Sequence, residues 1–131
     1  MEIKRGQGVS LVRAVEESAS KQQLPFFVGV SAENVGATRL ALILVVIPPG
    51  GHAEAHYHEG HESAIYLIKG RVKTLYGEGL KNEIISEAGD FLFIEPSVPH
   101  QPFNLDDKEP AIALVARTDP REQESVVLYK P

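Results

Sequence analysis

Four of the five histidines of this chain lie in one short stretch, GHAEAHYHEGHE, at residues 51–62. Imidazole is the commonest metal ligand in proteins and changes its charge near neutral pH. Side chains alternate between the two faces of a β-strand, so His56 and His58, which only Tyr57 separates, would project to the same side. Two imidazoles that project together into a barrel are half of a metal site.

The fifth histidine, His100, follows much later in the chain, in AGDFLFIEPSVPHQPFN. This segment contains a short apolar strand and a proline-rich turn before the histidine. If the two stretches face each other across a barrel, the nitrogens of His56, His58 and His100 converge. Several buried imidazoles rarely converge without a metal or a reaction.

The two stretches resemble, in content and spacing, the two motifs of the cupin superfamily. The first motif consists of Gly50, His56, His58 and Gly70, and the second of Gly89, Asp90, Pro96, His100 and Asn104. The resemblance covers about residues 45–105 and implies a small single-domain cupin of the conserved-barrel type. A lone HxH is common by chance, whereas this whole series in this order is specific.

The fourth ligand is where the sequence departs from the cupin pattern. Cupins usually have a glutamate with six residues between it and the closing glycine, and that position is Ser63 here. Glu62 is the adjacent carboxylate, and a β-bulge could turn it inward. His61 could ligate instead, or three histidines and water could hold the metal. In a regular strand Ser63 faces inward and Glu62 faces away. We predict His56, His58, Glu62 and His100 as the metal ligands.

A set of three imidazoles and one carboxylate suits Fe(II), Mn(II), Ni(II), Cu(II) or Zn(II), and the affinity order alone does not choose among them. The remaining one or two coordination positions could take water, dioxygen or a chelating substrate. We therefore predict a metal-dependent enzyme, of the dioxygenase or isomerase type, that acts on a small oxygenated molecule. Cupins have many functions on one scaffold, so a non-catalytic protein that binds a small metabolite or stores a metal is the alternative. An enzyme would have a titratable residue such as His61 or His52 beside the open position.

The elements that position these ligands are short strands. About eight segments rich in β-branched and aromatic residues lie between turn-forming glycines and prolines, at 26–30, 38–47, 64–68, 71–76, 82–86, 91–94, 111–116 and 124–129. This spacing is typical of a sandwich or barrel. Closing two sheets into a jelly roll hides most strand edges. We predict an all-β jelly-roll barrel, the double-stranded β-helix of the cupins.

Other parts of the chain refine this prediction. The segment VRAVEESASKQQ, residues 12–23, has helical spacing and predicts a short N-terminal helix. The length of 131 residues fits one domain over residues 1–131. The candidate core residues are Phe26, Phe27, Leu42, Leu44, Ile65, Leu67, Phe91, Phe93 and Leu114.

The composition limits the classes of partner and ligand that we expect for this protein. The absence of cysteine excludes disulfides and thiolate ligands, and with no recognisable export signal it predicts a cytoplasmic protein. A net charge of −5 with scattered Lys and Arg argues against nucleic acid and favours a small-molecule ligand or substrate. The longest apolar run, Leu40 to Ile47, is too short to span a membrane. Apolar strands such as ESVVLY at 124–129, and the habit of cupins to pair, predict a homodimer.

Overall fold

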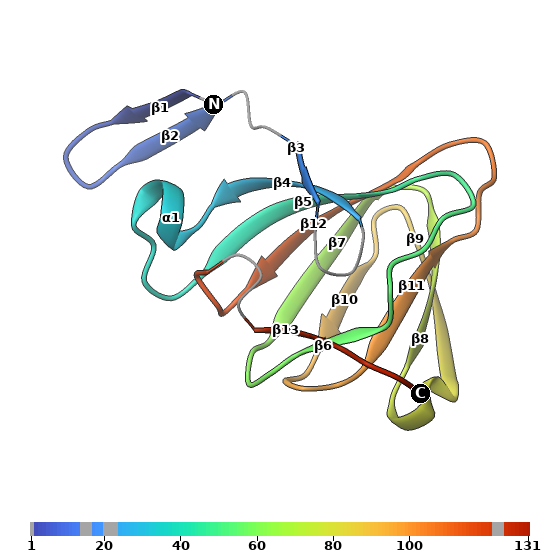
Figure 1. Ribbon diagram of the computed structural model, residues 1–131. Coiled ribbons are helices and arrows are strands. Elements are labelled where there is room, and N and C mark those ends of the chain that lie inside the picture. The colour runs from blue at the N-terminus through green and yellow to red at the C-terminus, as the bar shows by residue number, and fades with distance from the viewer. Residues whose placement is uncertain (1, 14–16, 20–23, 122–124) are drawn as a thin grey trace.

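Two antiparallel sheets face each other and enclose the core, as Figure 1 shows. The computed structural model describes residues 2–13, 17–19, 24–121 and 125–131. One sheet has six strands and the other has five. This two-layer arrangement confirms the prediction of an all-β jelly roll.

The eight strand segments predicted from the sequence are all present. The six-stranded sheet has the order β10-β7-β12-β5-β4-β3 and consists of β3 (Glu17–Ala19), β4 (Pro25–Val30), β5 (Ala41–Ile47), β7 (Ser63–Lys69), β10 (Phe91–Ile94) and β12 (Ala111–Arg117). The five-stranded sheet has the order β13-β6-β11-β8-β9 and consists of β6 (His56–His58), β8 (Arg71–Tyr76), β9 (Asn82–Glu87), β11 (His100–Asn104) and β13 (Val126–Leu128).

The N-terminal segment is a strand hairpin rather than a helix. β1 (Glu2–Arg5) and β2 (Ser10–Arg13) pair in a separate two-stranded sheet that stands away from the barrel (Figure 1). The predicted helix over 12–23 is wrong where the structure describes that range, because residues 12–13 belong to β2 and residues 17–19 belong to β3. Pairing of β3 with β4 supplies the backbone hydrogen bonds that a marginal, serine-containing helix would otherwise provide. The rest of the predicted helix lies outside the described residues.

The described helices are both short. α1 (Ala32–Val35) has Ser31 as its N-cap, whose side chain accepts from the Asn34 backbone N–H. Its C-cap is Gly36, in the left-handed conformation. The second is the 3-10 turn η1 (Glu78–Leu80). Neither of these two has the length or the apolar character needed to cross a membrane.

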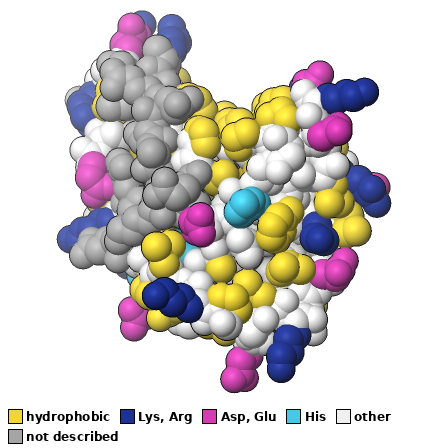
Figure 2. Space-filling model, turned by 45° about the vertical axis from the view of Figure 1, so that its right-hand side comes forward, with side chains coloured by type: hydrophobic (Ala, Val, Ile, Leu, Met, Phe, Trp, Pro, Cys, Tyr) yellow, Lys and Arg dark blue, Asp and Glu magenta, His cyan; other side chains and the backbone are white. Residues whose placement is uncertain are grey.

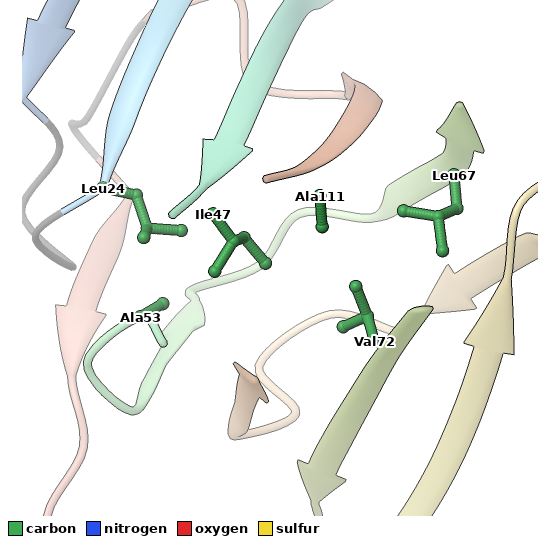
Figure 3. Close-up of a cluster of buried hydrophobic side chains, with 6 residues drawn as sticks. All are labelled: Leu24, Ile47, Ala53, Leu67, Val72 and Ala111. Carbon is green, nitrogen blue, oxygen red and sulfur yellow. The ribbon is translucent and has the colours of Figure 1, made fainter. Parts of the chain in front are cut away.

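The core lies between the two sheets. Figure 3 shows one cluster of side chains from both sheets, which consists of Leu24, Ile47, Ala53, Leu67, Val72 and Ala111. A second cluster consists of Phe26, Val28, Ile43 and Val115. Burial of these apolar surfaces is the main stabilising contribution in a domain of this size.

The outer face of the six-stranded sheet is apolar as well. Two predicted core residues on β10, Phe91 and Phe93, lie on this outer face and are 82% and 57% exposed. Their prediction as core residues is wrong, because alternation identifies two faces but cannot say which one faces inward when both are hydrophobic. Phe26 and Leu67 are buried as predicted, and Ile65 packs against the second core cluster. The prediction is also wrong for four half-buried residues that alternate with the inward-facing ones and line a hollow on the outer face, namely Phe27, Leu42, Leu44 and Leu114.

Gly70 lies where the chain passes from one sheet to the other, between β7 and β8. Its φ is +103°, in a region that L side chains rarely adopt. A Cβ at this position would lie 2.9 Å from the Cα and Cβ atoms of Ala111. Gly70 therefore permits a tight transition between the two strands that a residue with a side chain would strain.

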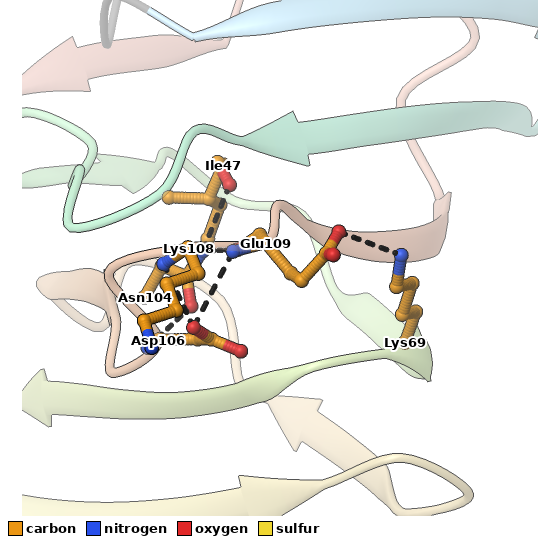
Figure 4. A network of polar contacts seen from close by, with 6 residues as sticks. All are labelled: Ile47, Lys69, Asn104, Asp106, Lys108 and Glu109. Carbon is orange, nitrogen blue, oxygen red and sulfur yellow. Dashed lines mark hydrogen bonds and ion pairs between the residues drawn. The ribbon is translucent and has the colours of Figure 1, made fainter.

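Asn104 connects the end of β11 to the end of β5 (Figure 4). Its buried Nδ2 donates to the carbonyl oxygens of Ile47, Pro48 and Glu109 at 2.9 to 3.2 Å, and its Oδ1 accepts from the Asp106 backbone N–H at 2.9 Å. This motif residue therefore has an architectural role. It fixes the far end of the strand that begins with His100.

Charged side chains of both signs lie over the surface. On the face in Figure 2, Lys and Arg are interspersed with Asp and Glu, and hydrophobic side chains lie between them. Two ion pairs between exposed side chains, Lys69 with Glu109 and Arg71 with Glu87, have N–O distances of 3.3 and 3.4 Å. Exposed pairs of this kind contribute little to stability.

Candidate metal centre

Strand pairing brings the three buried histidines together. His56 and His58 begin and end β6, and their side chains are buried while Tyr57 between them is half-buried. β11 pairs with β6 so that His100 lies directly opposite His56. One nitrogen from each of the three rings can be chosen so that all lie within 4.8 Å of one another. The sequence prediction that these imidazoles converge is confirmed.

Two of the rings are held by hydrogen bonds to nearby backbone carbonyls. The Nδ1 of His56 contacts the Glu54 carbonyl oxygen at 2.8 Å, and the Nδ1 of His100 contacts the Val98 carbonyl oxygen at 2.9 Å. A carbonyl oxygen only accepts, so each Nδ1 carries the proton and each Nε2 keeps a free lone pair. Such backbone contacts orient a ligating imidazole and fix its tautomer.

His58 differs from the other two histidines. Its Nδ1 is buried and has no hydrogen-bond partner among the described residues. An unsatisfied buried polar atom is costly in free energy, and such groups usually mark a site that takes an ion, a water or a ligand. The donor set and this unsatisfied atom both fit a divalent transition metal.

Burial keeps the three imidazoles neutral. It lowers the pKa of His56 to about 3, with the charge of His100 acting in the same direction, and it lowers the pKa of His100 to about 4. The pKa of His58 is lowered further by burial, to which the charge of Arg117 adds. The neutral imidazole is the form that binds a metal.

The histidines lie at the wall of a cavity between the sheets. The cavity has a volume of about 80 Å³. Its polar lining consists of His56, His58, Ser63, Thr74, Ser86, Asp90, His100 and Arg117, and the rest of the lining is apolar. The volume accommodates an ion with a few waters or a small molecule, and is far below the roughly 300–1,000 Å³ of pockets for drug-sized ligands.

The structure does not bring the predicted fourth ligand to the three imidazoles. β7 begins at Ser63, which pairs with Ile94, so Glu62 lies just before the strand. Ser63 is buried against the cavity, and Glu62 is exposed. Thr118 holds this loop, because the Glu62 backbone N–H donates to its Oγ1 at 3.1 Å.

The other histidines lie outside the cavity lining. His61 is half-buried and its Nδ1 is 3.2 Å from the Thr118 Oγ1. His52 is exposed and stacks on Phe103, with ring centroids 5.2 Å apart. Neither ring belongs to the group of possible ligands.

Sequence reasoning missed Arg117, the last residue of β12. This arginine is buried and lines the same cavity as the three histidines. The inward-facing positions of β12 are Ala111, Ala113 and Val115, and continued alternation places Arg117 in the same row. The signal was present in AIALVAR, but the predicted strand ended one residue earlier.

A family model described as "Cupin domain" matches residues 43–117. The 3-hydroxyanthranilate 3,4-dioxygenase of Xanthomonas euvesicatoria pv. vesicatoria (strain 85-10) is 32% identical over 92 residues, which cover 69% of this chain and 51% of the relative. The enzyme of the same name from Xanthomonas campestris pv. campestris (strain B100) is 29% identical over 92 residues, which again cover 69% of this chain and 51% of the relative. The chain thus spans about half the length of the curated relatives that it matches.

Solved structures share the fold. Oxalate decarboxylase from Bacillus subtilis at pH 4.6 superposes with a TM-score of 0.73 at 22% identity, over 86% of this chain and 29% of that one. A Klebsiella pneumoniae protein with a double-stranded β-helix domain has a TM-score of 0.69 at 17% identity, over 87% of this chain and 90% of that one. At such identities the likeness shows the architecture alone.

Proposed function

This chain belongs to the cupin family, and from this premise we propose that it is a metal-dependent enzyme acting on a small oxygenated molecule. His56, His58 and His100 are its proposed metal ligands. The reaction class we propose is oxygenation or isomerisation, and the relatives named 3-hydroxyanthranilate 3,4-dioxygenase favour the first. We treat residues 1–131 as one such domain.

One observation carries the proposal: three neutral imidazoles converge in a small, mostly apolar cavity. Two of them present an Nε2 lone pair because their Nδ1 protons are engaged by backbone carbonyls. Glu62 would join them only if the loop of residues 59–62 released its hydrogen bonds to Thr118. The proposal therefore needs three protein ligands, with the other positions left to water or substrate.

The chemistry that a divalent metal supplies at such a site is Lewis-acid polarisation of an oxygen atom of the substrate. The chain contributes the rest. Its imidazoles stay neutral and fixed in orientation, and the apolar wall that includes Ile65, Leu92 and Ile94 limits the water around the reacting atoms. The cavity volume restricts the substrate to a small molecule.

The test of this function begins with metal content. Protein made without a histidine tag and supplied with Fe(II), Mn(II), Ni(II), Cu(II) or Zn(II) should retain about one ion per chain, as measured by mass spectrometry of the elements. The loaded protein is then given a panel of small enols, aminophenols and hydroxy acids. Oxygen uptake identifies an oxygenase, and product formation without oxygen uptake identifies an isomerase.

Two outcomes would count against the proposal. Retention of none of these metals would contradict the metal site itself. Retention of a metal together with binding of a small metabolite but no turnover would favour the non-catalytic alternative. Neither outcome would alter the assignment of the fold.

We also propose that the chain forms a homodimer through the outer face of the six-stranded sheet. A shallow hollow on this face is lined by apolar side chains that include Phe27, Leu42, Leu44 and Leu114. The exposed Phe91 and Phe93 lie on the same face, and a contiguous exposed apolar patch often marks an interface. A second copy placed face to face would bury the same patch on both chains. The C-terminal strand β13 is a weaker candidate for the interface, because its Val126 is already buried.

Sedimentation equilibrium at micromolar concentration should give twice the chain mass of 14.3 kDa. Replacing Leu44 with lysine should shift the protein to the monomer, because a charged side chain would lie at the centre of the buried patch. Replacing the exposed Glu83 of the other sheet with lysine is the control and should leave the dimer intact. A wild-type protein that sediments as a monomer would contradict this interface.

A further inference from the structure

Arg117 places a positive charge inside the candidate metal cavity. Its side chain is 6% exposed and lines the same cavity as His56, His58 and His100. Its charge contributes to lowering the pKa of all three imidazoles, which indicates how near it lies to them. Burial lowers the pKa of Arg117 to about 10, so the guanidinium remains charged at neutral pH.

The hydrogen bonding of this guanidinium is incomplete. A guanidinium carries five N–H donors. Within the described part of the chain, the Arg117 guanidinium makes one hydrogen bond, a long one of 3.5 Å from Nε to the Ser63 Oγ, and no carboxylate oxygen lies within ion-pair distance of it. A buried guanidinium whose donors are mostly unpaired is costly, so the geometry suits a further hydrogen-bond acceptor within the cavity.

The described carboxylates near the cavity make no hydrogen bond to this guanidinium, although the charge of Asp119 offsets part of its own. Asp119 is buried and acts to raise the pKa of Arg117, but it does not line the cavity, and its Oδ1 accepts from the Arg121 backbone N–H at 3.0 Å. Asp90 lines the cavity but is exposed, and its Oδ2 accepts from the Glu87 backbone N–H at 2.7 Å. Glu62 is exposed and outside the lining.

We propose that the cavity binds a small organic carboxylate, with the carboxylate group against Arg117 and Ser63 and a second oxygen directed toward the three histidines. A carboxylate matches the planar fork of a guanidinium and can accept two of its N–H donors at once. The Ser63 hydroxyl can donate to the same group. The inference names a substrate class for the proposed function and rests on it.

Charge balance supports the same partner. Three neutral imidazoles would leave the charge of a divalent cation uncompensated, and Arg117 adds a positive charge to the same small space that Asp119, outside the cavity lining, offsets only in part. A carboxylate from the ligand would reduce the repulsion between the two. A neutral ligand of the same size would leave it unchanged, so the cavity should discriminate strongly by charge.

The test compares glycolate with glycolamide, which have nearly the same size and share the hydroxyl but differ in charge. Titration calorimetry with the wild-type protein, metal-loaded and metal-free, should show glycolate binding at least tenfold more tightly than glycolamide. In Arg117→Met this preference should disappear, whereas Arg117→Lys should keep part of it because a point charge remains without the fork. Nitrate is included to identify a site that accepts any anion.

Circular dichroism and metal content of each variant serve as controls for folding and for the metal site. Removal of the positive charge should leave metal retention equal or increased. Equal binding of glycolate and glycolamide by the wild-type protein would overturn the inference, and so would nitrate binding as tightly as glycolate. If Arg117→Met kept the preference for glycolate while losing thermal stability, the arginine would be a structural cation and the inference would be wrong.

Failure of the proposed function gives a different result. A protein that retains no metal but still prefers glycolate through Arg117 would refute the metal-dependent enzyme and leave the carboxylate site standing. A protein that retains metal and oxidises or isomerises only neutral molecules would support the metal-dependent enzyme and refute the carboxylate site. The comparison of the two ligands on the metal-free wild-type protein tests the inference even if a variant fails to fold, because a bound metal would itself prefer glycolate.

Discussion

His56→Ala and His100→Ala should each lose most of the bound metal while keeping the β-sheet circular dichroism of the wild type. Each substitution removes one of three imidazoles whose nitrogens lie within 4.8 Å of one another. With only two protein ligands left, we expect metal affinity to fall at least a hundredfold, or about 2.7 kcal/mol. Metal content after dialysis, followed by competition with a chelator of known affinity, measures the loss.

Matched controls come from the other polar residues of the same motif. His52→Ala, His61→Gln and Glu62→Gln should leave metal content near that of the wild type, because the three side chains lie outside the group of possible ligands. Full metal occupancy in His56→Ala or His100→Ala would contradict the site. A tenfold loss in Glu62→Gln alone would show that the loop rearranges and that the carboxylate ligates, as the sequence pattern predicts.

The second large effect should come from Asn104, through folding stability. Asn104→Ala removes the buried amide that donates to three carbonyl oxygens and accepts from the Asp106 backbone N–H. Each buried polar group left without a partner costs roughly 1–3 kcal/mol. We expect the free energy of unfolding to fall by about 3 to 5 kcal/mol, measured by urea denaturation of the metal-free protein.

Two further variants separate the contributions of this side chain. Asn104→Asp keeps the acceptor but replaces the donor by an oxygen that faces three carbonyl oxygens, so it should be at least as unstable as Asn104→Ala. Asn82 is exposed and makes one hydrogen bond, to the Tyr76 carbonyl oxygen at 3.3 Å, so Asn82→Ala should cost less than about 1 kcal/mol. Equal losses in Asn82→Ala and Asn104→Ala would refute the tethering role.

The strands and the three histidines could be predicted because their signals are local or lie in a distinctive series. Short segments rich in β-branched residues, bounded by glycines and prolines, predict strands whichever strands they pair with. His56 and His58 share a face by alternation, and only the motif containing His100 indicated that a distant strand would meet them. The sequence could not show that His100 would lie directly opposite His56, because that depends on the register of β6 with β11.

Other features depend on choices that alternation alone leaves open. The prediction of Phe91 and Phe93 as core residues fails because both faces of their sheet are apolar. The orientation of Glu62 depends on whether the strand entry is regular or bulged, and only the three-dimensional structure shows that Ser63 lines the cavity while Glu62 is exposed. Arg117 is a single charge at the end of an apolar run, where a solvent-exposed strand end is the ordinary expectation.

The strand pairs are nested within one another along the chain. Tyr76 pairs with Asn82, Arg71 with Glu87, Ser63 with Ile94, and His56 with His100. Residues 56–100 therefore form one long hairpin, folded over where it crosses between the sheets. If it zips from its tip, each pairing closes only a short additional loop, so the entropy cost of joining His56 to His100 is spread over small steps. In that order the three imidazoles meet last, at the end of the hairpin that lies farthest from its tip.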